Sequence, residues 1–160
     1  MISSSRSRPG GGLRSSRVRL GALTSLVFVA GTAVGTLGAQ YAVSSGEVFE
    51  SPGGTRLEVL LDAASLGSND VEVGEITFPV GADSGMHPHG STEIFYVLEG
   101  VLEHTVNGSA TELGPGMVGF VRPPDQVRHR VVGDTSVRAI VIWAPGGEAA
   151  RVTGNWQRRP

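Results

Sequence analysis

The feature that most constrains this chain is a set of three side chains of metal-binding type at odd-numbered positions: His87, His89 and Glu93. In an extended strand successive side chains alternate between faces, so these three share one face. Phe95 and Val97 continue that face as apolar residues, which indicates that it looks into a core. Two imidazoles and a carboxylate are costly to bury without partners, and one divalent metal ion satisfies all three. The spacing therefore predicts a mononuclear metal site inside a β-structure.

A fourth ligand is available further along the chain. His129 is flanked at the same parity by Val127 and Val131, so it also belongs to a strand face that looks inward. The chain contains no Cys, which excludes both disulfides and thiolate ligands. The predicted ligand set is His87, His89, Glu93 and His129.

The stretch from Gly81 to Gly100 resembles the first sequence motif of the cupin superfamily. Two histidines separated by one residue, a glutamate and the two flanking glycines all stand at the spacing of that motif. The run Pro124 to His129 is similar to the second motif, with Gln126 where the family has glycine and Gly133 where it has asparagine. The resemblance covers about residues 56–146. It implies a small single-domain cupin of the type-2, quercetin-dioxygenase-like group.

The strand and turn signals favour the same all-β fold. Many short apolar stretches are separated by turn signals every eight to twelve residues, which is typical of a β-sandwich or barrel. Asn107-Gly108 predicts a type I′ hairpin because both central positions of that turn require positive φ. We expect a single cupin β-barrel, a double-stranded β-helix or jelly roll, over residues 56–146. Residues 41–55 are predicted to be a linker and residues 147–160 a loose tail.

The first 40 residues differ in composition from the rest. Five arginines precede position 20, and no acidic residue occurs before Glu47. Residues 20–39 are uncharged and mostly small or apolar, which is typical of a signal peptide or a membrane anchor. We therefore expect an exported protein, either secreted or tethered through residues 20–39 to the outer face of the cytoplasmic membrane. The alternative is an N-terminal core helix of a soluble protein.

Charge and surface patterning restrict the partners. Beyond the basic arm, acidic residues outnumber arginines by seven, which argues against nucleic acid as a partner. Ile94, Tyr96 and Leu98 form an apolar row on the face opposite Glu93, which makes a homodimer through an outer sheet face one expectation. His104 has even parity and polar neighbours, so it is predicted to lie on the surface. Arg122 is the candidate for binding a substrate carboxylate.

The ligand set also restricts the chemistry. Nitrogen and oxygen ligands without sulfur suit Fe, Mn, Ni, Cu or Zn, and ligand identity does not choose among them. A small chelating substrate such as an enol, β-diketone or flavonol could bind such an ion. The resemblance to quercetinase-like cupins implies a dioxygenase in which Glu93 accepts the substrate proton. The alternatives are a non-oxidative isomerase or lyase, an exported small-ligand-binding cupin, and a site kept only for stability.

Overall fold

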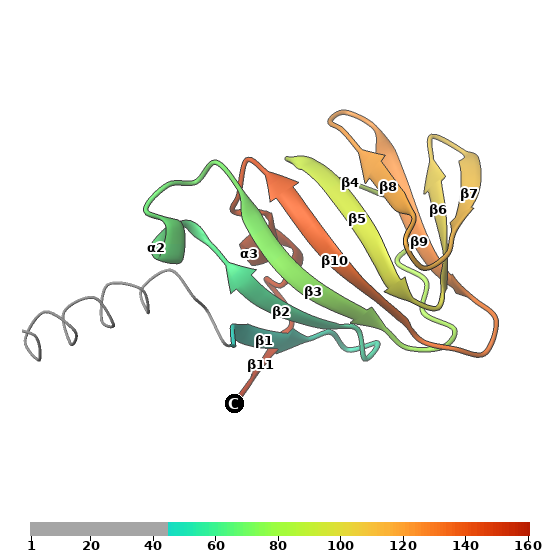
Figure 1. Ribbon diagram of the computed structural model, residues 1–160, viewed down its shortest axis with the longest axis horizontal. Coiled ribbons are helices and arrows are strands. Elements are labelled where there is room, and N and C mark those ends of the chain that lie inside the picture. The colour runs from blue at the N-terminus through green and yellow to red at the C-terminus, as the bar shows by residue number, and fades with distance from the viewer. Residues whose placement is uncertain (1–44) are drawn as a thin grey trace, which may run out of the picture. The chain divides into compact units, whose positions relative to one another are not determined.

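Two antiparallel β-sheets face each other in residues 45–160, the part of the chain that the computed structural model describes (Figure 1). The larger sheet has seven strands in the order β11 (Gln157–Arg159), β1 (Glu47–Glu50), β2 (Arg56–Leu61), β3 (Glu72–Phe78), β10 (Val137–Ala144), β5 (Thr92–Glu99) and β8 (Val118–Val121). The smaller sheet has four strands in the order β4 (His87–Pro88), β9 (Gln126–Val132), β6 (Val101–Val106) and β7 (Ser109–Leu113). Two short helices complete the fold, α2 (Ala63–Leu66) and α3 (Glu148–Val152). The predicted all-β barrel is confirmed.

The core lies between the two sheets and follows the period-2 pattern of the strands. In β3 every second residue is buried, and the same holds for β10 from Val137 to Trp143. Each of these two strands therefore turns one row of side chains into the core and the other row away from it. The buried apolar cluster draws on both sheets and includes Leu57, Phe95, Leu102, Val131 and Val141.

Two turns set the course of the strands that carry the site. Gly100 separates β5 from β6 at φ +76°, and a Cβ there would lie 2.4 Å from the carbonyl oxygen of Ser136. Glycine is thus required both for its conformation and for its size. Asn107 and Gly108 join β6 to β7 with φ values of 49° and 85°, as the type I′ prediction demands.

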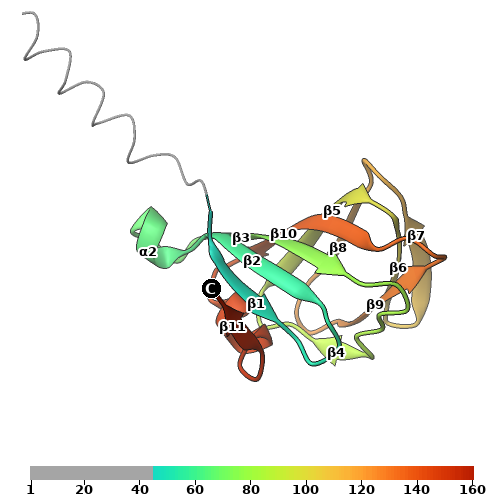
Figure 2. The same cartoon turned by 90° about the horizontal axis from the view of Figure 1, so that it is seen from below.

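The structure corrects the prediction of a linker at 41–55 and a loose tail at 147–160. Residues 47–50 form β1, and residues 157–159 form β11, which pairs with β1 in antiparallel register. Residues 148–152 form α3, close to β11 in Figure 2. Both strands are short, β1 with the sequence Glu-Val-Phe-Glu and β11 with Gln-Arg-Arg, so neither carries an alternation that the sequence analysis could detect. β1 pairs with β2 on one side and with β11 on the other, and β11 obtains its strand hydrogen bonds from β1.

The basic arm and the apolar segment of residues 20–39 lie outside the described residues, and so do residues 41–44 of the predicted linker. Within residues 45–160, neither helix has the length and apolar character needed to cross a bilayer.

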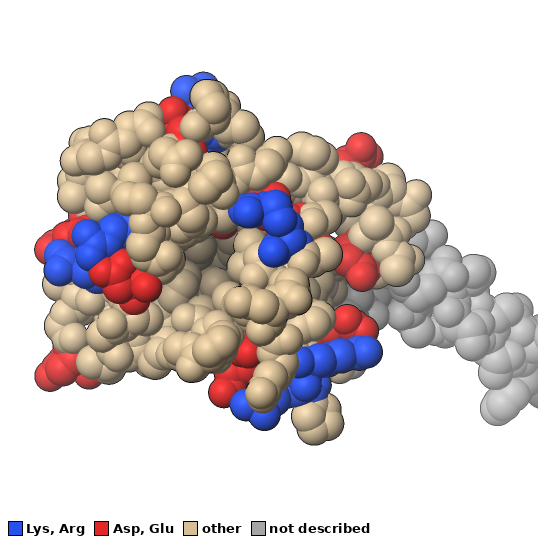
Figure 3. Space-filling view, turned by 180° about the vertical axis from the view of Figure 1, so that it is seen from behind, with Lys and Arg blue, Asp and Glu red and all other residues tan. Residues whose placement is uncertain are grey.

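The outer face of the larger sheet carries apolar side chains near one edge. Ile94 pairs with Phe120, and Tyr96 pairs with Val118, across β5 and β8. Phe120 is 58% exposed and Val118 57% exposed. Charged groups elsewhere are mixed: on the face shown in Figure 3, which is hollowed, acidic and basic side chains stand next to one another. No single-sign patch dominates that face.

Candidate functional site

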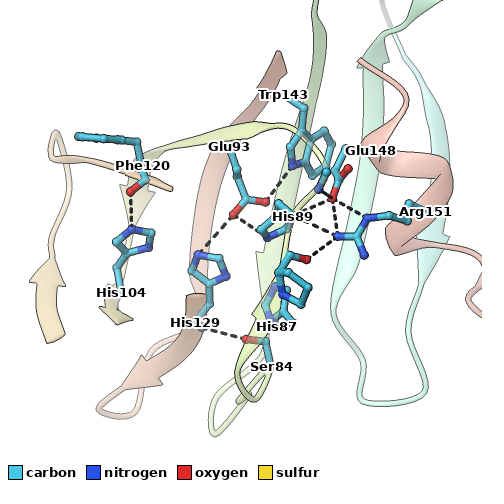
Figure 4. Close-up of polar contacts among 12 residues, drawn as sticks. Ser84, His87, His89, Glu93, His104, Phe120, His129, Trp143, Glu148 and Arg151 are labelled. Atoms are coloured by element: carbon cyan, nitrogen blue, oxygen red, sulfur yellow. Dashed lines mark hydrogen bonds and ion pairs between the residues drawn. The ribbon is translucent and has the colours of Figure 1, made fainter. Parts of the chain in front are cut away.

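The four predicted site residues come from three neighbouring segments of the barrel. His87 lies in β4, His89 directly follows it, Glu93 lies in β5 and His129 lies in β9. β4 pairs with β9 so that His87 stands opposite Val127, two residues from His129. The structure thus gathers all four residues in one region of the barrel interior (Figure 4).

Three of these side chains converge on one point. The Oε1 atom of Glu93 lies 3.2 Å from Nε2 of His89 and 3.5 Å from Nε2 of His129. All three atoms are buried, and none has a hydrogen-bond partner within residues 45–160. Neighbouring ligands about 2.0–2.1 Å from one ion lie about 3.0–3.4 Å apart. The separation of 3.2 Å falls in this range and that of 3.5 Å lies just above it, so both are close to what a shared ion requires. Burying a polar atom without a hydrogen bond costs desolvation free energy, and here three such atoms face each other.

His87 stands at the open side of this group. Its ring centroid lies 4.8 Å from that of His89 and 5.8 Å from that of His129. Its Nδ1 atom is 2.9 Å from the carbonyl oxygen of Gly85. Because a carbonyl only accepts, Nδ1 carries the proton in this hydrogen bond and Nε2 keeps its lone pair. The ring is held in the tautomer that a ligand needs.

The described side chains do not form an assembled metal cage. Within residues 45–160, no three His, Asp or Glu side chains are already arranged to hold an ion. The unpartnered atoms of His89, Glu93 and His129 nevertheless lie at ligand-like separations, so only small side-chain movements separate them from such an arrangement. The region has the donors for an ion.

Electrostatics favour a positive charge beside Glu93. Burial lowers the pKa of His129 to about 3, so that ring is neutral at ordinary pH. Burial also acts against a charge on His89, but contacts with Glu93 and Glu148 outweigh it and raise the pKa of His89. Burial acts to raise the pKa of Glu93 as well, yet the contact with His89 and the neighbouring imidazoles bring the net shift below the ordinary value. An ionised Glu93 thus faces a neutral His129 and a His89 on which a positive charge is stabilised.

Two further residues, Trp143 and Glu148, hold the site in place, and the sequence analysis predicted a site role for neither. The indole Nε1–H of Trp143 donates to Oε2 of Glu93 at 2.8 Å, which fixes that carboxylate and leaves Oε1 free. The two residues are direct partners across β5 and β10, so the strand register was the signal that could have found this bond. Glu148 of α3 lies 2.8 Å from Nδ1 of His89, and no local pattern marks it.

The prediction that His104 lies on the surface is wrong. This side chain is 5% exposed, its Nε2 lies 3.1 Å from the carbonyl oxygen of Phe120, and its ring stacks on His129 with centroids 5.2 Å apart. The prediction assumed that odd and even residues keep the same faces in β6 as in β5. The turn at Gly100 separates the two strands, so this alternation does not continue from one to the other. His104 is the direct cross-strand partner of His129, and such partners point to the same face.

A cavity of about 450 Å³ opens onto the site. One wall consists of strand residues that include the four predicted site residues and Phe95. A second wall comes from the C-terminal segment and contains Arg151, Val152 and Trp156. Arg122 is not part of the lining, so the carboxylate-binding role predicted for it finds no support. Arg151 stands at the cavity instead.

A larger hollow of about 1110 Å³ lies against β1, β2 and α3. Its lining holds no histidine, and several of its charged groups already pair with one another, as Arg56 does with Glu58. The smaller cavity, which reaches the unpartnered atoms, is the functional candidate.

Comparison with known proteins identifies the fold. Residues 74–144 match the family model described as the cupin domain. Together with the two facing sheets and the site between them, this match defines the class: residues 74–144 belong to the cupin domain family, and residues 45–160 have the fold of a single cupin domain. No curated protein matches the chain.

Solved structures agree with this assignment. A predicted oxalate decarboxylase from Thermotoga maritima is 21% identical, with a TM-score of 0.58, covering 65% of this chain and 98% of that one. An RmlC-like cupin from Shewanella frigidimarina is 23% identical, with a TM-score of 0.55 and coverage of 66% and 88%. KdgF from Halomonas sp. is 20% identical, with a TM-score of 0.52 and coverage of 61% and 86%. At these identities the likeness shows the fold, which hosts many chemistries.

Proposed function

We propose that this chain is a metal-dependent cupin enzyme, with one divalent transition-metal ion held by His87, His89, Glu93 and His129. The observation that carries the proposal is the convergence of three buried, unpartnered atoms: Nε2 of His89, Oε1 of Glu93 and Nε2 of His129. A cation bound between them would satisfy all three, whereas an empty site leaves their desolvation uncompensated. Nitrogen and oxygen donors without sulfur suit Fe, Mn, Ni, Cu or Zn.

Such an ion, when bound, supplies Lewis-acid chemistry and lowers the pKa of a chelating substrate. The protein's own contribution centres on Glu93. Trp143 holds Oε2 of this carboxylate, so Oε1 is the atom that would take a proton from a substrate hydroxyl, giving up its contact with the ion as it does so. Burial of Glu93 keeps bulk water from competing for that proton.

The cavity supports a small substrate. A volume of about 450 Å³ falls within the range of small-molecule sites, and Ile76, Phe78 and Phe95 give part of its lining an apolar character. We propose an oxygenase, specifically a dioxygenase, acting on a small enol, β-diketone or flavonol. A non-oxidative isomerase or lyase, and a binding protein without catalysis, are the alternative outcomes of the test.

The test is elemental analysis of the full chain purified without chelators or added metal, with oxygen uptake measured on the same sample. We expect near-stoichiometric transition metal, and oxygen uptake with a β-diketone or flavonol. The matched control is His89→Ala, which should lose both. Metal with substrate turnover but no oxygen uptake would replace the oxygenase by a non-oxidative enzyme. A chain that neither contains metal nor retains it after soaking would contradict the proposal and favour a binding protein.

We also propose that the protein is exported, on the basis of the basic arm and the apolar residues 20–39. Fractionation of cells that express the full chain should place it outside the cytoplasm, in the membrane or the secreted fraction. Recovery of the protein in the cytoplasm alone would contradict this.

A further inference from the structure

The C-terminal helix α3 places a buried carboxylate behind the candidate metal site. Glu148 is 3% exposed, and its Oε1 lies 2.8 Å from Nδ1 of His89, on the side of the ring opposite the unpartnered Nε2. The same oxygen accepts from the backbone N–H of Gly90 at 3.3 Å and from Nε of Arg151 at 2.7 Å. Among the four predicted ligands, Glu148 therefore contacts only His89.

These contacts settle where the proton on His89 lies. An unprotonated ring nitrogen and a carboxylate oxygen would repel at 2.8 Å, so one proton must lie between them. Nε of Arg151 already donates to Oε1, and Nη2 of Arg151 makes a second, short contact with it. Two guanidinium donors favour the ionised carboxylate, so the proton belongs to Nδ1 of His89.

We infer that Glu148 is a positioning residue: it holds His89 in the Nδ1–H tautomer and so keeps the Nε2 lone pair directed at Glu93 and His129. This inference rests on the proposed function for its purpose, since only a ligand at Nε2 makes that tautomer useful. Carboxylates that accept from the second nitrogen of a ligating histidine fix both its tautomer and its ring orientation.

Arg151 makes the role of Glu148 testable. Its Nη2 lies 3.3 Å from Nδ1 of His89, and it also donates to the carbonyl oxygen of Pro88 at 2.9 Å. If the carboxylate is removed, the nearest group to Nδ1 is therefore a donor. The favoured tautomer then reverses, with the proton on Nε2, where it blocks a metal ion.

Glu72 provides a matched control. It is a buried carboxylate in β3, and its Oε2 accepts from the backbone N–H groups of Gly147 at 3.2 Å and of Ala149 at 2.8 Å. It thus anchors the same helix as Glu148 without touching a histidine. A change at Glu72 disturbs α3, whereas a change at Glu148 also removes the acceptor for His89.

The experiment measures the His89 tautomer by ¹⁵N NMR of the ring, on the full chain freed of metal and at alkaline pH, where imidazoles are neutral. We expect Nδ1–H in the wild type and in Glu148→Gln, whose carbonyl oxygen can still accept. Glu148→Met, of similar length but unable to accept, should move the proton to Nε2. Glu72→Met should leave it on Nδ1. Nδ1–H retained in Glu148→Met, or an equal reversal in Glu72→Met, would overturn the inference.

Two further readouts keep the test independent of folding and of the proposed function. A wild-type protein with Nε2–H overturns the inference even if no variant folds. Titration with Co²⁺ should show about 10–100-fold weaker binding in Glu148→Met than in the wild type, with Glu72→Met unchanged. If the wild type does not bind Co²⁺, the proposed metal site fails, while the tautomer measurement still decides the role of Glu148.

Discussion

The cavity has two walls that are built in different ways. The strand wall carries His87, His89, Glu93 and His129 on or beside strands of the two sheets, where ladder hydrogen bonds and a packed core hold the backbone. The C-terminal wall, residues 148–156, is held by side-chain contacts such as that of Glu72 with the start of α3. Side chains on regular elements are positioned more precisely than those on short terminal segments. In the proposed enzyme the strand wall holds the metal ligands, and the C-terminal wall positions His89 through Glu148.

The largest effect should follow from loss of a ligand in the strand wall. We expect His129→Ala to reduce bound transition metal from near one equivalent to background, because it removes one of the three converging atoms. Elemental analysis of the purified protein is the measurement. Arg122→Ala, at an exposed position outside the cavity, is the control and should retain full metal. Full occupancy in His129→Ala would show that this residue is not a ligand.

The next effect concerns packing of the strand wall. Trp143 is fully buried and donates to Glu93, so we expect Trp143→Ala to cost about 3–5 kcal/mol of unfolding free energy. Denaturant unfolding of the metal-free protein measures it. A loss of unfolding free energy as small as that from substituting an exposed residue would mean that Trp143 does not support Glu93 as its contacts indicate.

The pH dependence of the metal-free protein should come from the same wall. His129 has a pKa of about 3 in the folded protein, below the ordinary value of 6.5. Between these values the unfolded chain takes up a proton that the folded protein does not, so stability falls as pH drops from about 6.5 towards 3. Denaturant unfolding at a series of pH values should show this loss, and His129→Gln should reduce its slope. An identical slope in the variant would assign the dependence to other groups.

The smallest effect should come from the C-terminal wall. Trp156 is only partly buried where it packs against the core, so Trp156→Ala should cost about 1 kcal/mol, well below Trp143→Ala. The same unfolding assay compares the two variants directly. Equal costs for the two tryptophans would remove the distinction between the walls.

The strand wall could be predicted from the sequence because its signals are local. His87, His89 and Glu93 lie within seven residues at the spacing of one motif, and this short spacing was the signal, although β4 and β5 belong to different sheets and parity along one strand does not join them. His104 was misplaced because parity was extended through Gly100, where a turn begins a new strand. Its burial follows from the β6–β9 register, which pairs it with His129. Register depends on the whole sheet, and a single strand does not reveal it.

The C-terminal wall could not be predicted for a related reason. Glu148 follows a Gly-Gly pair and belongs to a helix of five residues, so neither periodicity nor a motif marks it. Its partners are residues distant in the sequence: Glu72 binds the start of its helix, and His89 lies against its carboxylate. Only the assembled sheet brings these residues together.

The pairing of β1 with β11 has a consequence for the order of folding. Glu47 and Arg158, which form an ion pair across these strands, are 111 residues apart. Contacts of such long range carry a large loop-closure cost and form late. During synthesis the barrel strands and all four histidines emerge before β11, so the edge of β1 stays open in the meantime. We expect a nascent chain to pass through a stage in which the histidines are in place and the cavity still lacks its second wall.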